Sequence, residues 1–405
     1  MKKRVIYFII SSILFFIIIV LSSFNKEVNW ISIYILIPIL YCFSILKIKV
    51  GILKSKPLII LYSLFFLMIL GGFAANNIDL YLSEIRRMFI VVMFCTIVYL
   101  FSLKDPNFSS LFYILYSIKF LFFFYYAYDN GLLTTQVDIK RFNLEELNSN
   151  AFGYFAFFAI TGSFILLLLT SRPFYKFLNL LVLIMVMIMS FISVYLSASR
   201  AGLIFVSASI IIYYLIYFVF PFTRKSIPYF VLILCTLVLL QPHIQKALEN
   251  SLITKRFEIA KGDHRIDLLK MGMEVGLDHP IFGVGSGNFN IYTKEGAHSS
   301  FAGILANNGI PGLMLYIYLI YEALKKAYIN LKSNKFVSRV RLVFFIFFIL
   351  FALYNFFYWF HLNLFLLGFF FIIRAHLENI NKVTKNVTRF NFKTFSTFQK
   401  NQLAK

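Results

Sequence analysis

The sequence predicts an all-α integral membrane protein with about twelve transmembrane helices and one large extracytoplasmic loop. Of its 405 residues, 60% are hydrophobic and 14% are charged, whereas soluble domains carry about a quarter charged residues. A soluble fold has no means of hiding so much apolar surface, so lipid must surround most of the chain. The apolar runs are continuous rather than alternating, which favours a helical bundle over a β-barrel.

Candidate spans were located as apolar runs of about 20 residues, the length that a helix needs to cross a bilayer. The first run is long for a signal peptide and no A-x-A site follows it, so it is interpreted as a transmembrane helix. The candidate spans are 4–24, 28–46, 57–75, 85–103, 108–128, 150–170, 177–197, 201–220, 227–244, 300–323, 341–359 and 361–375.

The distribution of Lys and Arg predicts the orientation of these spans. With the N-terminus inside, most of the Lys and Arg residues fall in inside segments, as the positive-inside rule requires. The net charge of +22 is therefore interpreted as loop charge rather than as a nucleic-acid surface. Both termini are predicted to be cytoplasmic. The expected parts are membrane helices at 1–244, the extracytoplasmic loop at 245–299, further membrane helices at 300–376, and a basic cytoplasmic tail at 377–405.

No metal or cofactor is predicted. The three cysteines, Cys42, Cys95 and Cys235, all lie in apolar runs, so neither a disulfide framework nor a metal cluster is indicated. The acidic and histidine residues of the extracytoplasmic loop lack any metal-ligand spacing such as H-E-x-x-H.

Arg200 is the first candidate site residue. It stands at a tight boundary between two spans, in the run Ser197–Ala198–Ser199–Arg200. Its side chain is expected either to snorkel to the interface or to bind a phosphate group in bidentate fashion, for which arginine is the preferred residue. Physical chemistry alone favours neither of these two interpretations.

The extracytoplasmic loop contains a predicted amphipathic helix at 264–278. Its apolar residues, Ile266, Leu269, Met273 and Leu277, recur at helical spacing. Pro280 and a G-x-G-x-G run at 283–287 then end the helix. No strand precedes these glycines, so a tightly turned loop is favoured over a phosphate cradle.

His298 lies where this loop re-enters the membrane. A lone histidine is more often structural, but a neutral imidazole at this position can accept a proton from a hydroxyl group. The run Gly309–Ile310–Pro311–Gly312 that follows lies inside an apolar stretch and predicts a broken helix, which either lines a cavity or is a packing kink. Asn307 and Asn308 would need hydrogen-bond partners at that depth.

Other charges at membrane level are Arg86, Arg87 and Lys119. A lysine inside a span is costly in lipid, so Lys119 is a site hypothesis by default. The alternative is a shifted span from which Lys119 snorkels to the interface.

The order of motifs resembles the bacterial O-antigen ligase/polymerase family (Wzy and WaaL type). Asn150 opens a span; S-R-x-G follows at 199–202, then R-x-x-L from Arg265 and D-H-P-x-x-G-V-G-x-G-N-F at 278–289, and finally A-H-S-S-F at 297–301 and N-G-I-P-G at 308–312. The resemblance covers roughly residues 148–320. Each motif is short, and the specificity lies in their order and membrane placement.

The resemblance implies a metal-independent membrane glycosyltransferase of the GT-C class in the bacterial inner membrane. Its substrate would be an undecaprenyl-diphosphate-linked oligosaccharide, and its partners a chain-length regulator and a flippase. Arg200 and Arg265 match the family's diphosphate-binding arginines, and His298 matches its catalytic histidine. Further candidate substrate contacts are Arg86, Arg87, Arg141, Asn150, Gly285 and Gly287.

Three departures from the family pattern favour a polymerase of O-antigen or capsule repeat units over a ligase. Many relatives have an aromatic residue near Leu268 or Leu269, many have asparagine where Ser299 stands, and many ligases have an acidic residue near Asn308. The alternative is a ligase or oligosaccharyltransferase that transfers glycan to lipid A core or protein. A membrane transporter is the alternative from another class, supported by Lys119 and the predicted helix break.

Overall fold

A computed structural model of the chain describes residues 2–23, 25–47, 55–129, 143–144, 147–196, 199–220, 228, 231, 264–293, 298–332, 339–356 and 363–380. Several predictions lie outside these residues: nearly all of the span at 227–244, the loop from 245 to 263, Arg141 and the tail beyond 380. The regular secondary structure of the described part is helical apart from one short antiparallel hairpin, β1 (Asn143–Leu144) with β2 (Leu147–Asn148).

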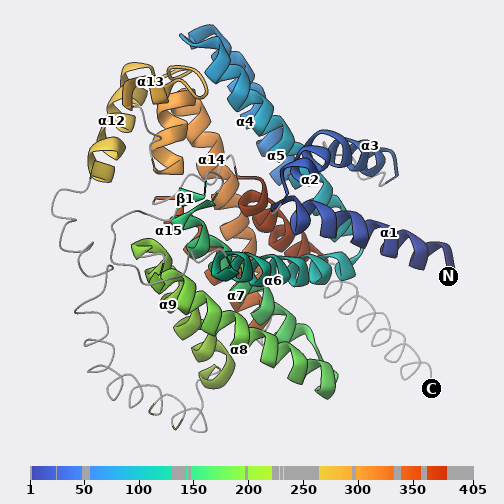
Figure 1. Cartoon of the computed structure of the whole chain (residues 1–405). Helices are drawn as coiled ribbons and strands as arrows, with labels where there is room; N and C mark the ends of the chain where they lie inside the picture. The colour runs from blue at the N-terminus through green and yellow to red at the C-terminus, as the bar shows by residue number, and fades with distance from the viewer. Residues whose placement is uncertain are drawn as a thin grey trace, which may run out of the picture.

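Figure 1 shows how the helices are arranged. The helical elements are α1 (Lys2–Ile19), η1 (Leu21–Ser23), α2 (Lys26–Ile31), η2 (Ser32–Leu36), α3 (Ile37–Lys47), α4 (Lys56–Leu70), η4 (Gly71–Ala74), α5 (Ile78–Lys104), α6 (Pro106–Asp129), α7 (Ser149–Leu169), α8 (Pro173–Leu196), α9 (Arg200–Tyr214), η5 (Leu215–Val219), α12 (His264–Asp278), α13 (Phe289–Thr293), α14 (Ser300–Lys332) and α15 (Arg339–Tyr354). Residues 364–380 form a further helix.

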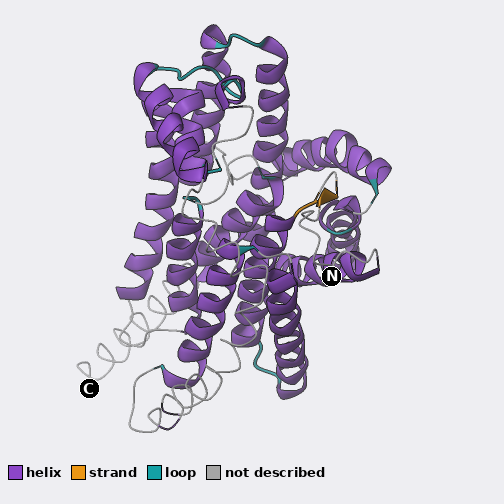
Figure 2. Cartoon of the chain, turned by 60° about the vertical axis from the view of Figure 1, so that its left-hand side comes forward, coloured by secondary structure: helices purple, strands orange, loops and turns teal. Residues whose placement is uncertain are grey.

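The prediction of an all-α integral membrane protein is confirmed. Within the described residues, 8 helices are long and apolar enough to cross a membrane. The predicted spans at 4–24, 341–359 and 361–375 correspond to the shorter helices α1, α15 and 364–380. The total of twelve stays a prediction. Figure 2 shows several long helices running in roughly the same direction, with a group of shorter helices at one end.

The helix at 364–380 lies in the centre of the bundle. Five consecutive residues, 369–373, are fully buried, so every face of this helix is covered by protein. The helix continues to residue 380, past the predicted start of the cytoplasmic tail at 377. A sequence pattern does not distinguish a central helix from a lipid-facing one, because both are continuously apolar.

Arg374 of this central helix is buried in an ionic network. Its guanidinium donates to both carboxylate oxygens of Glu322 on α14, at 3.0 and 2.8 Å, and to Glu378 at 2.7 Å. Tyr99 of α5 also donates to Glu378, at 3.0 Å. Arg374 is 2% exposed and lies inside the bundle, paired with these two carboxylates.

The α14 segment folds back on itself at Gly309, whose φ of 68° and ψ of −170° interrupt the helix. In a continuous helix, residues 300 and 316 would lie roughly 24 Å apart. Here Asn355 accepts hydrogen bonds from both the Ser300 backbone N–H, at 2.9 Å, and the Tyr316 hydroxyl, at 2.5 Å. The Phe301 and Tyr316 rings are 6.0 Å apart. Residues 300–308, the short arm, and 310–332, the long arm, therefore form a helical hairpin.

This hairpin confirms the predicted helix break and corrects the predicted span at 300–323. The long arm alone is roughly 34 Å long, enough to cross a bilayer. The short arm is equally apolar, and hydropathy therefore joined the two into one span. Only the glycine at residue 309, where a positive φ is required, marked the point at which the chain reverses.

Candidate functional site

The tip of the hairpin is closed by the loop that follows α12. The Val284 N–H donates to the Ala306 carbonyl at 2.9 Å, and the Ile310 N–H donates to the Pro280 carbonyl at 2.8 Å. These bonds satisfy backbone groups that the helix break sets free. The motif D-H-P-x-x-G-V-G at 278–285 thus packs directly against the motif N-G-I-P-G at 308–312, which contains the break.

The side-chain oxygens of Asn307 and Asn308 have hydrogen-bond partners, as expected, whereas the buried Asn307 Nδ2 has none among the described residues. The Asn307 side-chain oxygen accepts from the Phe289 N–H at 3.0 Å, and the Asn308 side-chain oxygen accepts from the Ser286 hydroxyl at 2.7 Å. Asn307, Asn308 and Ser286 are all buried. Both asparagines therefore hold the glycine loop against the hairpin.

Gly285 and Gly287, predicted as substrate contacts, are packed against backbone. Both have positive φ. A Cβ on Gly285 would lie 2.8 Å from Ala75, and one on Gly287 would lie 2.9 Å from the Leu80 carbonyl oxygen. The preferred interpretation of this run, a tightly turned loop, explains both glycines by their contacts with Ala75 before α5 and with the first turns of α5.

The helix α12 packs on the short arm through two glycines. A Cβ on Gly272 would lie 3.1 Å from that of Ala302, and one on Gly276 would lie 2.4 Å from the Leu305 side chain. Because both pairs advance in the same direction along the chain, α12 and the short arm run parallel. The G-x-x-x-G spacing of 272–276 is typical of close helix packing in membranes, a signal that the sequence analysis did not use.

The predicted apolar stripe of α12 is not the face that packs on the short arm. Leu268 and Val275 are buried beside the two glycines, whereas Ile266, Met273 and Leu277 are exposed. Hydrophobic periodicity identified a real stripe, but it did not indicate whether protein or lipid covers it. Leu269 lies between the two faces and is partly buried.

His298 stands immediately before the short arm. Its φ of 51° is positive, the one such value among the described residues other than glycine. A non-glycine residue in this region is strained, and such strain concentrates at functional sites. Ser299 follows and caps the arm: its hydroxyl accepts from the Ala302 N–H at 3.5 Å, and its carbonyl accepts from the Gly303 N–H.

Asn355 anchors this end of the hairpin to α15. Its carbonyl accepts from the Ser300 N–H and from the Ser299 hydroxyl, the latter at 3.3 Å. Its side chain accepts from Tyr316 and donates to the Phe351 carbonyl at 2.7 Å. The backbone at His298 is therefore positioned by a polar residue at the end of a membrane helix, for which no motif gave a signal.

Arg200 is the first residue of α9, and the start of α9 lies close to the same anchor. Ser199 caps the helix by accepting from the Gly202 N–H. One turn on, the Phe205 ring stacks on that of Tyr354, with centroids 4.0 Å apart. Tyr354 directly precedes Asn355, so Arg200 and His298 flank one contact network at the end of α15.

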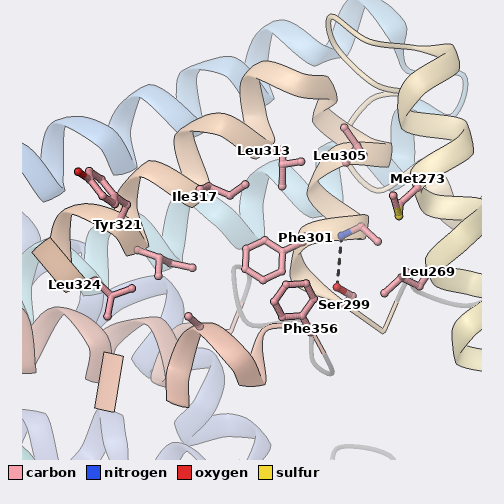
Figure 3. Close-up of a pocket in the computed structure, with 13 residues that line it drawn as sticks. Leu269, Met273, Ser299, Phe301, Leu305, Leu313, Ile317, Tyr321, Leu324 and Phe356 are labelled. Atoms are coloured by element: carbon pink, nitrogen blue, oxygen red, sulfur yellow. Dashed lines mark hydrogen bonds between the residues drawn. The ribbon is translucent and has the colours of Figure 1, made fainter. Parts of the chain in front are cut away.

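Arg265 lies in the first turn of α12, one helical turn before Leu269. Leu269 and Ser299 line the same cavity, which has a volume of about 480 Å³. Figure 3 shows this cavity between α12, the two arms of the hairpin and the end of α15, with the hydrogen bond from Ala302 to Ser299 near Leu269. The beginnings of α9, α12 and α14, which carry Arg200, Arg265 and His298, are thus linked through Tyr354, Asn355 and this cavity.

The cavity is apolar along most of its length. Phe301 and Leu305 contribute from the short arm, and Leu313, Ile317 and Leu324 from the long arm. Such a lining suits a hydrocarbon chain better than a sugar.

The remaining candidate site residues are not drawn into this network by the described contacts. Arg86 and Arg87 are exposed on α5, where Arg87 lies 3.8 Å from Glu84. Asn150 is the second residue of α7. The glycine that follows it in this helix, Gly153, meets Gly202 of α9, so the start of α7 lies beside the start of α9.

Lys119 is buried inside the bundle. It is 1% exposed, and its ammonium group lies 3.1 Å from the centre of the Phe365 ring and 4.8 Å from that of Phe155. Among the described residues its Nζ has no hydrogen-bond partner. The snorkelling alternative does not fit this position, because the amine points into aromatic side chains.

Together these features define a helical membrane protein with an apolar cavity lined by Ser299, the neighbour of His298, and by Leu269 of α12. Residues 185–317 match the family model Wzy_C, described as O-antigen ligase. This segment of the chain is therefore a domain of the bacterial O-antigen ligase/polymerase family, and the resemblance of the motifs is confirmed. The match extends from α8 into the long arm of the hairpin and includes Arg200, Arg265 and His298. No curated protein matches the chain.

Proposed function

We propose that this protein polymerises undecaprenyl-diphosphate-linked oligosaccharide repeat units for O-antigen or capsular polysaccharide. The observation that carries the proposal is that Ser299, next to His298, and Leu269 of α12 line one apolar cavity. Ser299 also contacts Asn355, and the neighbouring Tyr354 stacks on Phe205 of α9. A lipid-linked sugar diphosphate has a charged diphosphate, which arginine side chains can bind. It also has a long hydrocarbon chain, which an apolar surface can bind.

In the proposed reaction, an acceptor hydroxyl attacks C1 of the donor sugar. The bond between C1 and the diphosphate oxygen breaks as the new glycosidic bond forms, and His298 accepts the hydroxyl proton as general base. Arg200 and Arg265 bind the undecaprenyl diphosphate that leaves, which stabilises its developing charge without a divalent metal. The strained backbone of His298 is in keeping with a preorganised catalytic group.

A ligase is the second candidate, since the matched family model is itself described as O-antigen ligase. In that case the same donor chemistry would transfer finished glycan to lipid A core or to protein. The transporter alternative loses its main support, because the helix break is closed by the glycine loop and Lys119 packs between aromatic rings.

Gel analysis of surface polysaccharide from a deletion strain tests the proposal. A polymerase predicts loss of the long ladder while a single repeat unit remains attached to core or lipid. Accumulation of long lipid-linked polymer without attached repeats would instead identify a ligase. An unchanged polysaccharide profile would contradict both activities. Restoration by a plasmid copy of the gene is the control.

A further inference from the structure

The exposed surface of α12 is divided into an apolar and a polar stripe. Ile266, Met273 and Leu277 are 57%, 47% and 60% exposed. Their spacing of seven and four residues places them on one line along the helix. The glycine face with Leu268 and Val275 points to the short arm instead, so the apolar stripe is not part of the packing between helices.

Charged side chains occupy a separate line on the same helix. Asp267, Lys270 and Glu274 are exposed, and their spacing of three and four residues places them on a line of their own beside the apolar stripe. A helix whose exposed surface is split in this way is typical of a boundary between lipid and water. A fully hydrated loop helix has no reason to keep such a stripe apolar.

The apolar stripe continues onto a membrane helix across the mouth of the cavity. Met273 of α12 and Ile317 of the long arm both line the cavity, and each is 47% exposed. Met314, one turn from Ile317 towards the hairpin tip, is 65% exposed. Because the long arm is a predicted membrane span, the medium that covers Met314 and Ile317 is lipid. The apolar surface is continuous from Ile317 across the cavity to Met273, so lipid can also cover Met273.

We propose that α12 is seated in the bilayer leaflet at this end of the bundle, with Ile266, Met273 and Leu277 in contact with the acyl chains of membrane lipids. The helix then forms one lip of the cavity mouth, with lipid along its apolar stripe and water along its charged stripe. This goes beyond the sequence-based expectation of a soluble loop. It is independent of the proposed reaction, since it concerns only what covers α12.

Spin-label accessibility in lipid nanodiscs tests this placement. Single cysteines replace Met273 and Leu277 on the apolar stripe, Lys270 and Glu274 on the charged stripe, and Met314 as the lipid reference. The background lacks the three native cysteines. Collision with oxygen, which concentrates in lipid, is compared with collision with a water-soluble nickel chelate.

The expected result is a ratio of oxygen to nickel collisions at Met273→Cys and Leu277→Cys that matches Met314→Cys. The ratio at Lys270→Cys and Glu274→Cys should be lower by several-fold. Nickel-dominated collisions at both stripe positions would overturn the proposal in favour of a hydrated helix. Low accessibility to both reagents would overturn it as well, because the stripe would then be covered by protein.

A second measurement avoids labels altogether. Met273→Trp, in a background where Trp30 and Trp359 are replaced by phenylalanine, should be quenched by lipids brominated on the acyl chains. Glu274→Trp is the matched control and should be quenched much less. Equal quenching of the two variants would contradict an asymmetric seating of α12.

Discussion

Gly153 of α7 and Gly202 of α9 meet so closely that a Cβ on Gly153 would lie 2.6 Å from the Cα of Gly202. The same Cβ would lie 2.8 Å from the Tyr354 hydroxyl. The start of α9, and with it Arg200, is therefore set by direct contact between two backbones and the end of α15. The glycine of the S-R-x-G motif has a packing explanation of its own, apart from any contact with substrate.

Gly153→Ala is expected to lower the free energy of unfolding by about 1–3 kcal/mol, because the added methyl group overpacks the contact with Gly202. Displacement of α9 should also reduce the length of the polysaccharide made. Thermal unfolding in detergent and the gel profile measure the two effects. Gly71→Ala is the matched control, since its added Cβ meets nothing nearer than 3.7 Å, and a loss of stability as large as that of Gly153→Ala would refute the packing argument.

Arg200→Ala and Arg265→Ala are each expected to abolish the long polysaccharide ladder while the protein still accumulates in the membrane. Removal of one charge-stabilising donor typically slows a reaction by about 10²–10³-fold. His298→Ala should have the same effect if it is the general base. Arg172→Ala, at the exposed turn before α8, is the control. A wild-type glycan length distribution in both arginine variants would remove their diphosphate roles.

Asn355 and Tyr316 are predicted to be energetically coupled. Asn355→Ala removes the 2.5 Å bond of the buried Tyr316 hydroxyl, and one hydrogen bond typically contributes about 0.5–1.5 kcal/mol to stability. Adding Tyr316→Phe to Asn355→Ala should therefore cost less than Tyr316→Phe alone. A double-mutant cycle on thermal stability measures the coupling, which we expect to be roughly 0.5–3 kcal/mol. Additive effects would show that the bond does not anchor the hairpin.

Arg374→Met is expected to destabilise the protein by up to about 3–5 kcal/mol, because it leaves the partly buried carboxylates of Glu322 and Glu378 without their cation. The triple variant Arg374→Met, Glu322→Gln, Glu378→Gln removes the charges together and should recover part of this loss. Thermal unfolding of the purified protein compares the two. A single variant as stable as the wild type would mean that water reaches the carboxylates.

Lys119→Met is expected to raise the unfolding temperature and to leave the polysaccharide profile unchanged. The substitution keeps the length of the side chain and removes a buried amine that has no hydrogen-bond partner among the described residues. The lost contact with the Phe365 ring is a smaller term. Loss of polymer with unchanged stability would instead assign Lys119 to the reaction.

The sequence predicted most of the fold because membrane spans are long apolar runs. It also located the break near Gly309 and the need of Asn307 and Asn308 for partners. It did not predict that the chain reverses at the break, because both arms are equally apolar. The ion pair of Arg374 was not predicted, since its partner Glu322 lies on a helix distant in sequence that only the folded chain brings near.

The candidate site was predicted from motifs, and the structure gives some of the motif residues a packing role. Gly202, Gly285 and Gly287 are explained by close backbone approach. Asn355 was missed because a single asparagine at a helix end carries no pattern. The apolar stripe of α12 was predicted, but the medium that covers it was not, since periodicity identifies a stripe without indicating whether protein or lipid lies against it.

The hairpin in α14 has a consequence for how deep His298 lies. A helix rises about 1.5 Å per residue, so residues 300–308 hold His298 roughly 13 Å from the closed tip at Gly309. The short arm is in effect a spacer of fixed length between the glycine loop and the histidine. Gain or loss of one helical turn in this arm would translate the histidine by about 5 Å along the bundle, while every motif on either side stayed intact. The length of the short arm therefore sets the position along the bundle at which His298 can meet an acceptor.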